Sequence, residues 1–364
     1  MKKTYRYMAL GLIIRVLTLT LAACSGEDVI EQFLGDDPNF QTDTGPEGEG
    51  ANTSTTAPVF LDYKAVSSTE INFQFSLPVK VVSLNFDPPV EVESWDEGNT
   101  ITVTLLKPLK GGERFVADLL VEDEKRNTLN VLVPFRARND QIPQLLITEL
   151  RTEVSKLKVE FVELKTLSAG NLGALRLFAA TESMDVPLFE FPPMEIEAGK
   201  YLVVHLRSAE EGILNETGPD PGESGGTEAS PEAWDFWVPE SKERFRKTDA
   251  VYLLDQDDQI IDSVLFSETA GVSWAKESLA KAAEFLGSRG AWLPKENAGS
   301  GEAPPDNPPP GPADAVDSSK TTNTRSICRD ETLPDSNSAA DWYITVASGA
   351  TPGKANNPKR YVAN

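Results

Sequence analysis

Residues 145–178 read LLITELRTEVSKLKVEFVELKTLSAGNLGALRLF, and the fold class of the C-terminal half depends on how this stretch is interpreted. The apolar residues at helical spacing are Val154, Leu157, Phe161 and Leu164. The β-branched Val159 and Val162 instead suit a pleated strand with apolar residues on both faces, and Gly170 permits a tight reversal after it. The stretch therefore predicts the opening strands of a β-sandwich, with a helix as the alternative.

The composition is typical of an all-β chain. A length of 364 residues allows two domains of ordinary size, and a hydrophobic share of 40% is sufficient for folded cores. The 26 prolines and 25 glycines indicate many turns. We therefore expect two β-sandwiches in series.

The charge excludes one class of partner. With 57 acidic and 34 basic side chains, the chain has a formal charge of −23. Such a surface repels phosphate backbones, whose binding requires clustered Lys and Arg. Nucleic acid is therefore not an expected partner, and solubility alone accounts for the charge.

The N-terminus has the pattern of a leader peptide. Lys2, Lys3 and Arg6 precede an apolar run that Arg15 interrupts. A transmembrane anchor is the alternative, but a spanning helix requires about 20 apolar residues and the run is shorter. The sequence Leu21-Ala22-Ala23-Cys24 resembles the bacterial lipobox.

That resemblance implies a lipoprotein signal peptide over residues 1–23 and lipid attachment to Cys24. It also implies a location at a bacterial membrane, either the outer membrane or facing the periplasm, with the membrane itself as a partner. Several acyl chains would make the attachment persistent, because each buried methylene contributes about 0.8 kcal/mol. Residues 24–57 are acidic and rich in Gly, Pro and Thr, and we expect a flexible tether there.

Residues 58–138 show the alternation of half-buried strands. Ile71, Phe73 and Phe75 alternate with polar residues, and the pattern recurs at 101–105. Other strands are expected at 59–63, 79–86, 115–121 and 131–135. The run from Leu109 to Phe135 resembles the last strands of bacterial Ig-like domains, which implies that this unit is a spacer.

Residues 142–357 resemble the lamin-tail domain, an Ig-like sandwich also found in bacterial envelope proteins. The matching segments, in the order of that family, are Ile147-Thr148-Glu149, 160–164, Leu172-Gly173, 197–204, 249–255, 260–266, 326–329, Asp341-Trp342 and 351–353. The chain departs from the family in insertions at about 207–247 and 270–320. The second insertion contains a helical pattern over 274–286, followed by a proline-rich run.

Acidic residues at 255–262 raise the possibility of a calcium loop. Counted from Asp255, Ile260 stands where such a loop needs Gly, and Phe266 stands where it needs Glu. A hairpin turn over 256–259 is the better interpretation, because Asp tolerates tight turns. No metal or cofactor is predicted.

His205 and Cys328 are the remaining candidates for chemistry. His205 is the only histidine, and hydrolytic triads require a histidine beside a nucleophile and a carboxylate. Cys328 is the one thiol left if Cys24 is acylated, and a cysteine requires a base to act as a nucleophile. We expect both residues to be structural, and no catalytic residue is predicted.

The first insertion contains a candidate contact site. Aromatic residues with nearby Arg are typical of binding hot spots, and here they are Trp234, Phe236, Trp237, Arg244 and Arg246. The alternative is that the rings pin the insertion onto the sandwich while the basic run is a solvated face.

These patterns predict a non-catalytic, lipid-anchored cell-envelope protein that presents a lamin-tail-like domain for protein or glycan binding. An accessory or degenerate component of an envelope hydrolase system is the alternative from another class, because lamin-tail-like domains are found beside hydrolases. Purely structural packing in the envelope is a third possibility, and it needs no exposed aromatic patch.

Overall fold

A computed structural model describes residues 57–363, apart from 156–157, 209, 212, 240–241, 243 and 299–307. The described residues belong to one compact unit, Thr56–Asn364. The predicted signal peptide, Cys24 and all but the last residue of the predicted tether lie outside the described residues.

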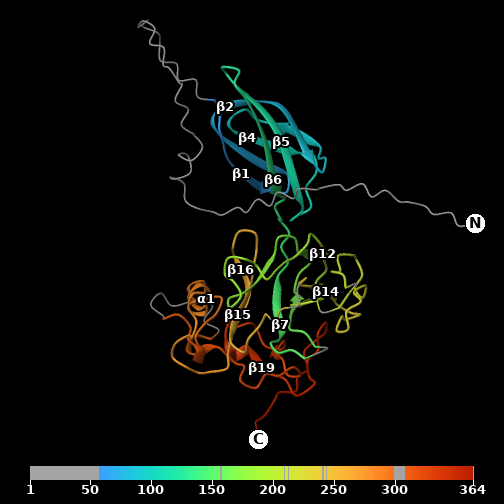
Figure 1. Ribbon diagram of the computed structural model, residues 1–364, viewed down its shortest axis with the longest axis vertical. Coiled ribbons are helices and arrows are strands. Elements are labelled where there is room, and N and C mark those ends of the chain that lie inside the picture. Colours follow the sequence, from blue (N-terminus) through green and yellow to red (C-terminus); the bar gives the residue numbers. More distant parts are fainter. Residues whose placement is uncertain are drawn as a thin grey trace, which may run out of the picture. The chain divides into compact units, whose positions relative to one another are not determined.

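The described part of the chain contains 19 strands and one α-helix, α1 (Glu277–Ser288). The predicted all-β fold class is therefore confirmed, including a short helix in the second insertion. In Figure 1, the strands within residues 60–136 gather in one group, and the later strands gather with α1 in another.

The sandwich nearer the N-terminus, here called the proximal sandwich, contains six strands. They are β1 (Phe60–Ser67), β2 (Glu70–Asp87), β3 (Val92–Trp95), β4 (Gly98–Leu105), β5 (Arg114–Asp123) and β6 (Thr128–Arg136). Their order is β3-β4-β2-β5-β6, and β1 pairs with β2. Ile71, Phe73 and Phe75 are buried in its core, as the alternation predicts.

One strand is longer than the sequence predicts. The two strands expected at 71–75 and 79–86 are a single strand, β2, whose first half pairs with β1 and β4 and whose second half pairs mainly with β5. The ladder to β4 shifts register between Gln74 and Val79, which brackets Pro78. Proline has no N–H to donate and is tolerated at such irregular positions.

The sandwich nearer the C-terminus, here called the distal sandwich, is built from two larger sheets and one pair of short strands. One sheet has the order β14-β13-β8-β7-β18-β19, the second β11-β10-β15-β16-β17, and the pair is β12-β9. The strands of the first sheet are β7 (Leu145–Arg151), β8 (Phe161–Thr166), β13 (Tyr201–His205), β14 (Trp234–Trp237), β18 (Ile327–Arg329) and β19 (Trp342–Ile344). The others are β9 (Gly170–Asn171), β10 (Arg176–Ala179), β11 (Phe189–Glu190), β12 (Glu195–Ile196), β15 (Asp249–Leu254), β16 (Ile260–Ser267) and β17 (Val316–Asp317). One buried apolar cluster contains side chains from both larger sheets, so they enclose a common core.

The stretch at 145–178 forms strands, and the helical alternative is wrong. β7 and β8 pair antiparallel, with Leu145 opposite Thr166 and Arg151 opposite Phe161. Val162 and Leu164 point into the core. Phe161 and Glu163, on the other side of the strand, are also buried, and this two-sided burial explains why the pattern is ambiguous in the sequence.

Both insertions contribute to the sheets. The first provides β14, which runs parallel to β13, and the second provides β17, which runs parallel to β16. Helix α1 begins at Glu277, three residues later than predicted, and Lys276 is its N-cap. Its buried residues Leu279, Ala282, Ala283 and Leu286 are those that the sequence places near one face.

The two sandwiches meet at a tight backbone contact. Gly112 has a φ of +80°, and a Cβ there would lie 2.5 Å from the Cα of Gly173. Beside this contact, the buried Asn139 donates from Nδ2 to the carbonyl oxygens of Asn171 at 2.7 Å and Gly173 at 2.9 Å. Its backbone N–H donates to Gln256 Oε1 at 2.8 Å. Specific polar contacts therefore hold the two sandwiches against each other.

Candidate functional site

The chemically reactive side chains of the distal sandwich lie on the outer face of its six-stranded sheet. Glu149, Glu163, His205, Asp235 and Cys328 are all there, and each is completely buried. Residues 230–233 of the first insertion and 350–353 of the closing segment cover this face. The two covering segments touch, because a Cβ on Gly353 would lie 2.2 Å from Ser230 Oγ.

His205 is paired with a carboxylate. Its Nε2 lies 2.6 Å from Asp235 Oδ1, on the neighbouring strand. Its ring stacks on Trp237, with centroids 3.9 Å apart and an interplanar angle of 12°. Asp235 Oδ2 accepts the Ser230 N–H at 2.7 Å. The arrangement resembles two members of a hydrolytic triad, but His205 is inaccessible to a substrate because it has no exposed surface.

Glu149 and Glu163 are two buried carboxyl groups on adjacent strands. Glu163 accepts hydrogen bonds from Thr148 Oγ1 at 2.6 Å and from the Gly353 N–H at 2.7 Å. Burial raises the pKa of both carboxyls, and the charge of Glu149 raises that of Glu163 further. These carboxyls fix the closing segment on the sheet, since Glu149 also accepts the Thr351 N–H at 3.0 Å.

Cys328 lies beside this pair. Its Sγ is 3.6 Å from Glu149 Oε1 and 3.5 Å from Ser326 Oγ. Burial, together with the charge of Glu149, raises the pKa of the thiol well above its usual value. The thiol is therefore buried and kept in its neutral form, which is the form that suits a structural role.

The acidic residues at 255–262 form the predicted hairpin turn. Asp255 Oδ1 accepts the N–H groups of Asp257 at 2.8 Å and Gln259 at 2.9 Å, and Asp258 has a φ of +59°. Asp257 and Asp258 bind arginines, and Asp262 pairs with the buried Arg329 at 2.8 Å. These carboxylates are used for ion pairs within the protein. No group of three or more potential metal ligands is found among the described residues.

The aromatic residues of the first insertion are buried. Trp234, Phe236 and Trp237 form β14, with exposures of 5%, 0% and 6%. Trp234 and Phe236 enter the core, whereas Trp237 lies on the outer face with His205. This placement favours the interpretation that the rings pin the insertion, so their faces do not form a surface patch.

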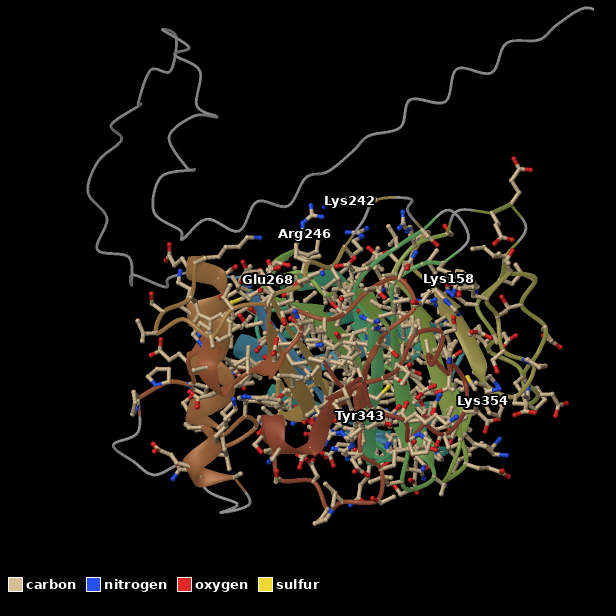
Figure 2. The ribbon with its side chains drawn as sticks, turned by 90° about the horizontal axis from the view of Figure 1, so that it is seen from below. Lys158, Lys242, Arg246, Glu268, Tyr343 and Lys354 are labelled. Carbon is tan, nitrogen blue, oxygen red and sulfur yellow. The ribbon has the colours of Figure 1, made fainter. Side chains whose placement is uncertain are left out.

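The two candidate arginines are in different environments. Arg244 is largely buried and pairs with Glu182 at 2.9 Å. Arg246 is exposed, and Figure 2 shows it with Lys242 at the edge of the molecule. The structure therefore separates these residues from the aromatic rings that the sequence groups with them.

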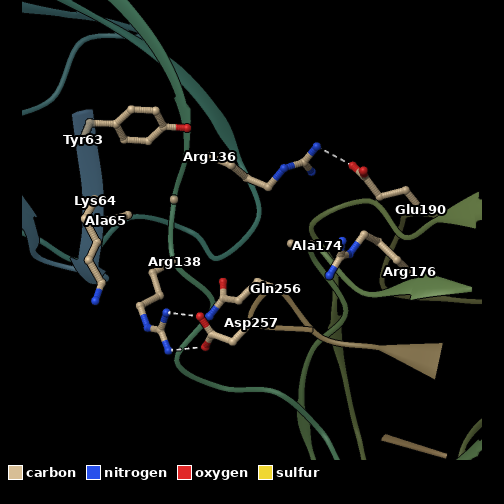
Figure 3. Close-up of a pocket in the computed structure, with 11 residues that line it drawn as sticks. Tyr63, Lys64, Ala65, Arg136, Arg138, Ala174, Arg176, Glu190, Gln256 and Asp257 are labelled. Carbon is tan, nitrogen blue, oxygen red and sulfur yellow. Dashed lines mark hydrogen bonds and ion pairs between the residues drawn. The ribbon is translucent and has the colours of Figure 1, made fainter. Parts of the chain in front are cut away.

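Two hollows beside the junction of the sandwiches could not be predicted from the sequence. The first, of about 390 Å³, is lined by basic residues from both sandwiches, including Lys64, Arg136 and Arg176 (Figure 3). The second, of about 750 Å³, lies under the first insertion and is lined by Pro219, Asp220, Pro221, Lys200 and the edge of Trp234. The residues of each hollow are far apart in the sequence, so no local motif predicts them.

The described residues thus define an all-β protein of two sandwiches in which the reactive side chains of the distal sheet are enclosed. The chain belongs to the family whose model is described as "TP_1001_2nd: protein second domain", and the match covers residues 143–344, more than half of the chain. This match spans most of the distal sandwich.

Two further similarities were found. An uncharacterized protein of Treponema pallidum (strain Nichols) is 25% identical over 190 residues, which are 50% of this chain and 48% of that protein. The chain therefore matches about half the length of this relative. The crystal structure of the N-terminal part of the bacterial S-layer protein SbsC aligns with a TM-score of 0.22 and 12% identity, over 58% of this chain and 44% of that one.

The described residues include no helix with the length and apolar character that crossing a membrane requires.

Proposed function

We propose that this protein is a non-catalytic, lipid-anchored component of the bacterial cell envelope, with a proximal Ig-like spacer and a lamin-tail-like distal domain. In this proposal the distal domain binds a protein or glycan partner through surfaces formed by its insertions.

The covered outer face of the distal sheet is the observation that carries the non-catalytic part of the proposal. Catalysis requires a nucleophile or general base that a substrate can reach. His205, Cys328 and the two glutamates are buried, and each bonds to a neighbouring residue or to the closing segment, whereas Nδ1 of His205 has no partner among the described residues. A substrate would have to displace two covering segments to reach them.

The lipid anchor rests on the lipobox resemblance at residues 21–24. Cells that express the protein are grown with a clickable fatty acid, and the purified protein is tested for label. We expect label on the wild type and none on Cys24→Ala. Label that persists on the variant would reject the anchor.

The contact surface is expected at the 750 Å³ hollow under the first insertion. Its volume is within the range of about 300–1,000 Å³ found for small-ligand sites, and it combines the apolar surface of two prolines with polar groups. Cross-linking on intact cells followed by mass spectrometry identifies neighbours. We expect partner cross-links within this hollow to be lost in Asp220→Arg but retained in Asp257→Arg, whose side chain lines the other hollow. Equal recovery from both variants would place the contact elsewhere.

A further inference from the structure

The 390 Å³ hollow between the sandwiches, here called the junction cleft, has an unusual charge for this chain. Four basic and two acidic side chains line it, although acidic residues outnumber basic ones 57 to 34 in the whole sequence. Charges farther away than about 8 Å are largely screened at physiological salt. Each of the three arginines is paired with a carboxylate, so the positive charge that a ligand meets comes mainly from Lys64 and from the arginine N–H groups that these pairs leave free.

Neighbouring acceptors hold the arginines of the junction cleft in position. Arg138 makes two hydrogen bonds to Asp257, at 3.0 and 2.6 Å (Figure 3). Its Nε also lies 3.3 Å from Asp140. Arg176 donates from Nη2 to Asp258 at 2.7 Å and to the carbonyl oxygen of Asp255. A side chain fixed in this way loses little entropy when it binds a ligand.

Some donors in the junction cleft have no partner within the described part of the chain. A guanidinium carries five N–H donors, yet Arg176 uses only those on Nη2, and Arg136 uses Nη1 for the carbonyl of Gly112 and Nη2 for Glu190. The ammonium of Lys64 is exposed, and it forms no hydrogen bond or ion pair with the other described residues. It is close enough to Asp257 to help lower the pKa of that carboxyl, although the hydrogen bond from Arg138 is the larger cause.

We propose that the junction cleft binds a small oxyanionic ligand, a sugar-sized molecule bearing a carboxylate or phosphate, through Lys64, Arg136 and Arg176. Figure 3 shows Lys64 on one side of the cleft and Arg176 on the other, with Arg138 and Asp257 between them. An anion that bonds to both Lys64 and Arg176 contacts both sandwiches. The volume of about 390 Å³ suits a ligand of this size. Tyr63 adds a hydroxyl donor to the lining.

This inference goes beyond the proposed function, because the cleft exists whether or not the chain is anchored or has an envelope partner. The test uses the full-length protein in detergent micelles and isothermal titration calorimetry at constant ionic strength. The probes are glucuronate, glucose 6-phosphate and neutral glucose. We expect saturable binding of at least one anion and none of glucose, and the anion that binds identifies the ligand as carboxylate- or phosphate-bearing.

Variants then assign the binding to the junction cleft. Lys64→Gln should weaken binding about tenfold, because it removes one charge-assisted hydrogen bond. Lys80→Gln is the matched control, since it removes the same charge from an exposed position on a neighbouring strand, outside the cleft lining. It should change the affinity by less than about twofold.

Arg176→Gln provides a second test, with its fold checked by circular dichroism because it also breaks the pair with Asp258. We expect the folded variant to lose binding about tenfold or more. The proposal is overturned if no anion binds saturably, if glucose binds equally well, or if Lys64→Gln and Lys80→Gln weaken binding to the same extent.

Discussion

At the scale of single residues, buried titratable groups hold the covering segments of the distal sandwich in place. A buried polar atom is costly unless it is hydrogen-bonded. Glu163 meets this requirement by bonding to Thr148 on β7 and to Gly353 of the closing segment. Asp235 bonds to His205 on β13 and to Ser230 of the first insertion.

The raised pKa of Glu163 makes stability depend on pH. A carboxyl whose folded-state pKa is raised contributes stability that is fully present below about pH 4.5 and is lost as the pH rises through the folded value. Glu163→Gln cannot ionise, and its amide can still pair with Thr148 and Gly353.

Relative to the variant, the wild type should therefore lose unfolding free energy as the pH rises above about 4.5. Urea titrations at several pH values measure this difference. The exposed Glu97→Gln is the control and should follow the wild type. Parallel curves for the wild type and Glu163→Gln would contradict the assignment.

A substitution of Trp237 tests whether the aromatic residues of β14 stabilise the fold. Its ring is only 6% exposed and stacks on His205, so Trp237→Ala should lower the free energy of unfolding by about 3–5 kcal/mol. Trp95→Ala, at a position 46% exposed, should cost much less. Similar small losses for both, measured by urea denaturation, would mean that Trp237 lies at the surface.

At the scale of elements, most strands were predictable, whereas the burial of their outer face was not. Ile71, Phe73 and Phe75 alternate with polar residues, so their period identifies β2. Glu163 follows the same period but is buried, because a closing segment almost 200 residues later covers it. For residues 234–237 the sequence left open a contact site or rings that pin the insertion, because the partner strand β13 lies about 30 residues earlier, in a parallel pairing that no local pattern indicates.

The first insertion is organised around one buried carboxylate. Glu216 accepts the N–H groups of Gly222 at 3.1 Å, Ser224 at 2.6 Å and Asp235 at 2.9 Å. Glu216→Ala leaves these donors without an acceptor, so we expect at least about 2 kcal/mol of destabilisation and early protease cleavage within 213–233.

The exposed Glu232 of the same insertion provides the control, and Glu232→Ala should leave the cleavage pattern unchanged. Identical digestion of both variants would show that Glu216 does not hold the insertion.

At the scale of the whole molecule, the junction determines whether the sandwiches move together. The close approach of Gly112 to Gly173 could not be predicted, because only the fold brings these residues together. The same reason applies to the junction cleft, whose residues come from β1, β6, β10 and the β15–β16 turn.

Two glycines with the same backbone conformation test the junction. Gly112 and Gly199 both have a φ of +80°, but only Gly112 has atoms where a Cβ would lie. Gly199→Ala should cost about 1 kcal/mol from backbone strain alone. Gly112→Ala should cost more and loosen the junction, which small-angle scattering detects as a larger radius of gyration. Equal behaviour of the two variants would mean that the sandwiches do not meet at Gly112.

The most direct test of the enclosed outer face is the reactivity of Cys328. In a Cys24→Ala chain it is the only thiol, and it is completely buried. We predict that a thiol reagent labels the native protein at least about a thousand-fold more slowly than the urea-unfolded protein, because labelling requires opening of the covering segments. Labelling of the native protein as fast as the unfolded one would contradict the enclosed face, and with it the non-catalytic assignment.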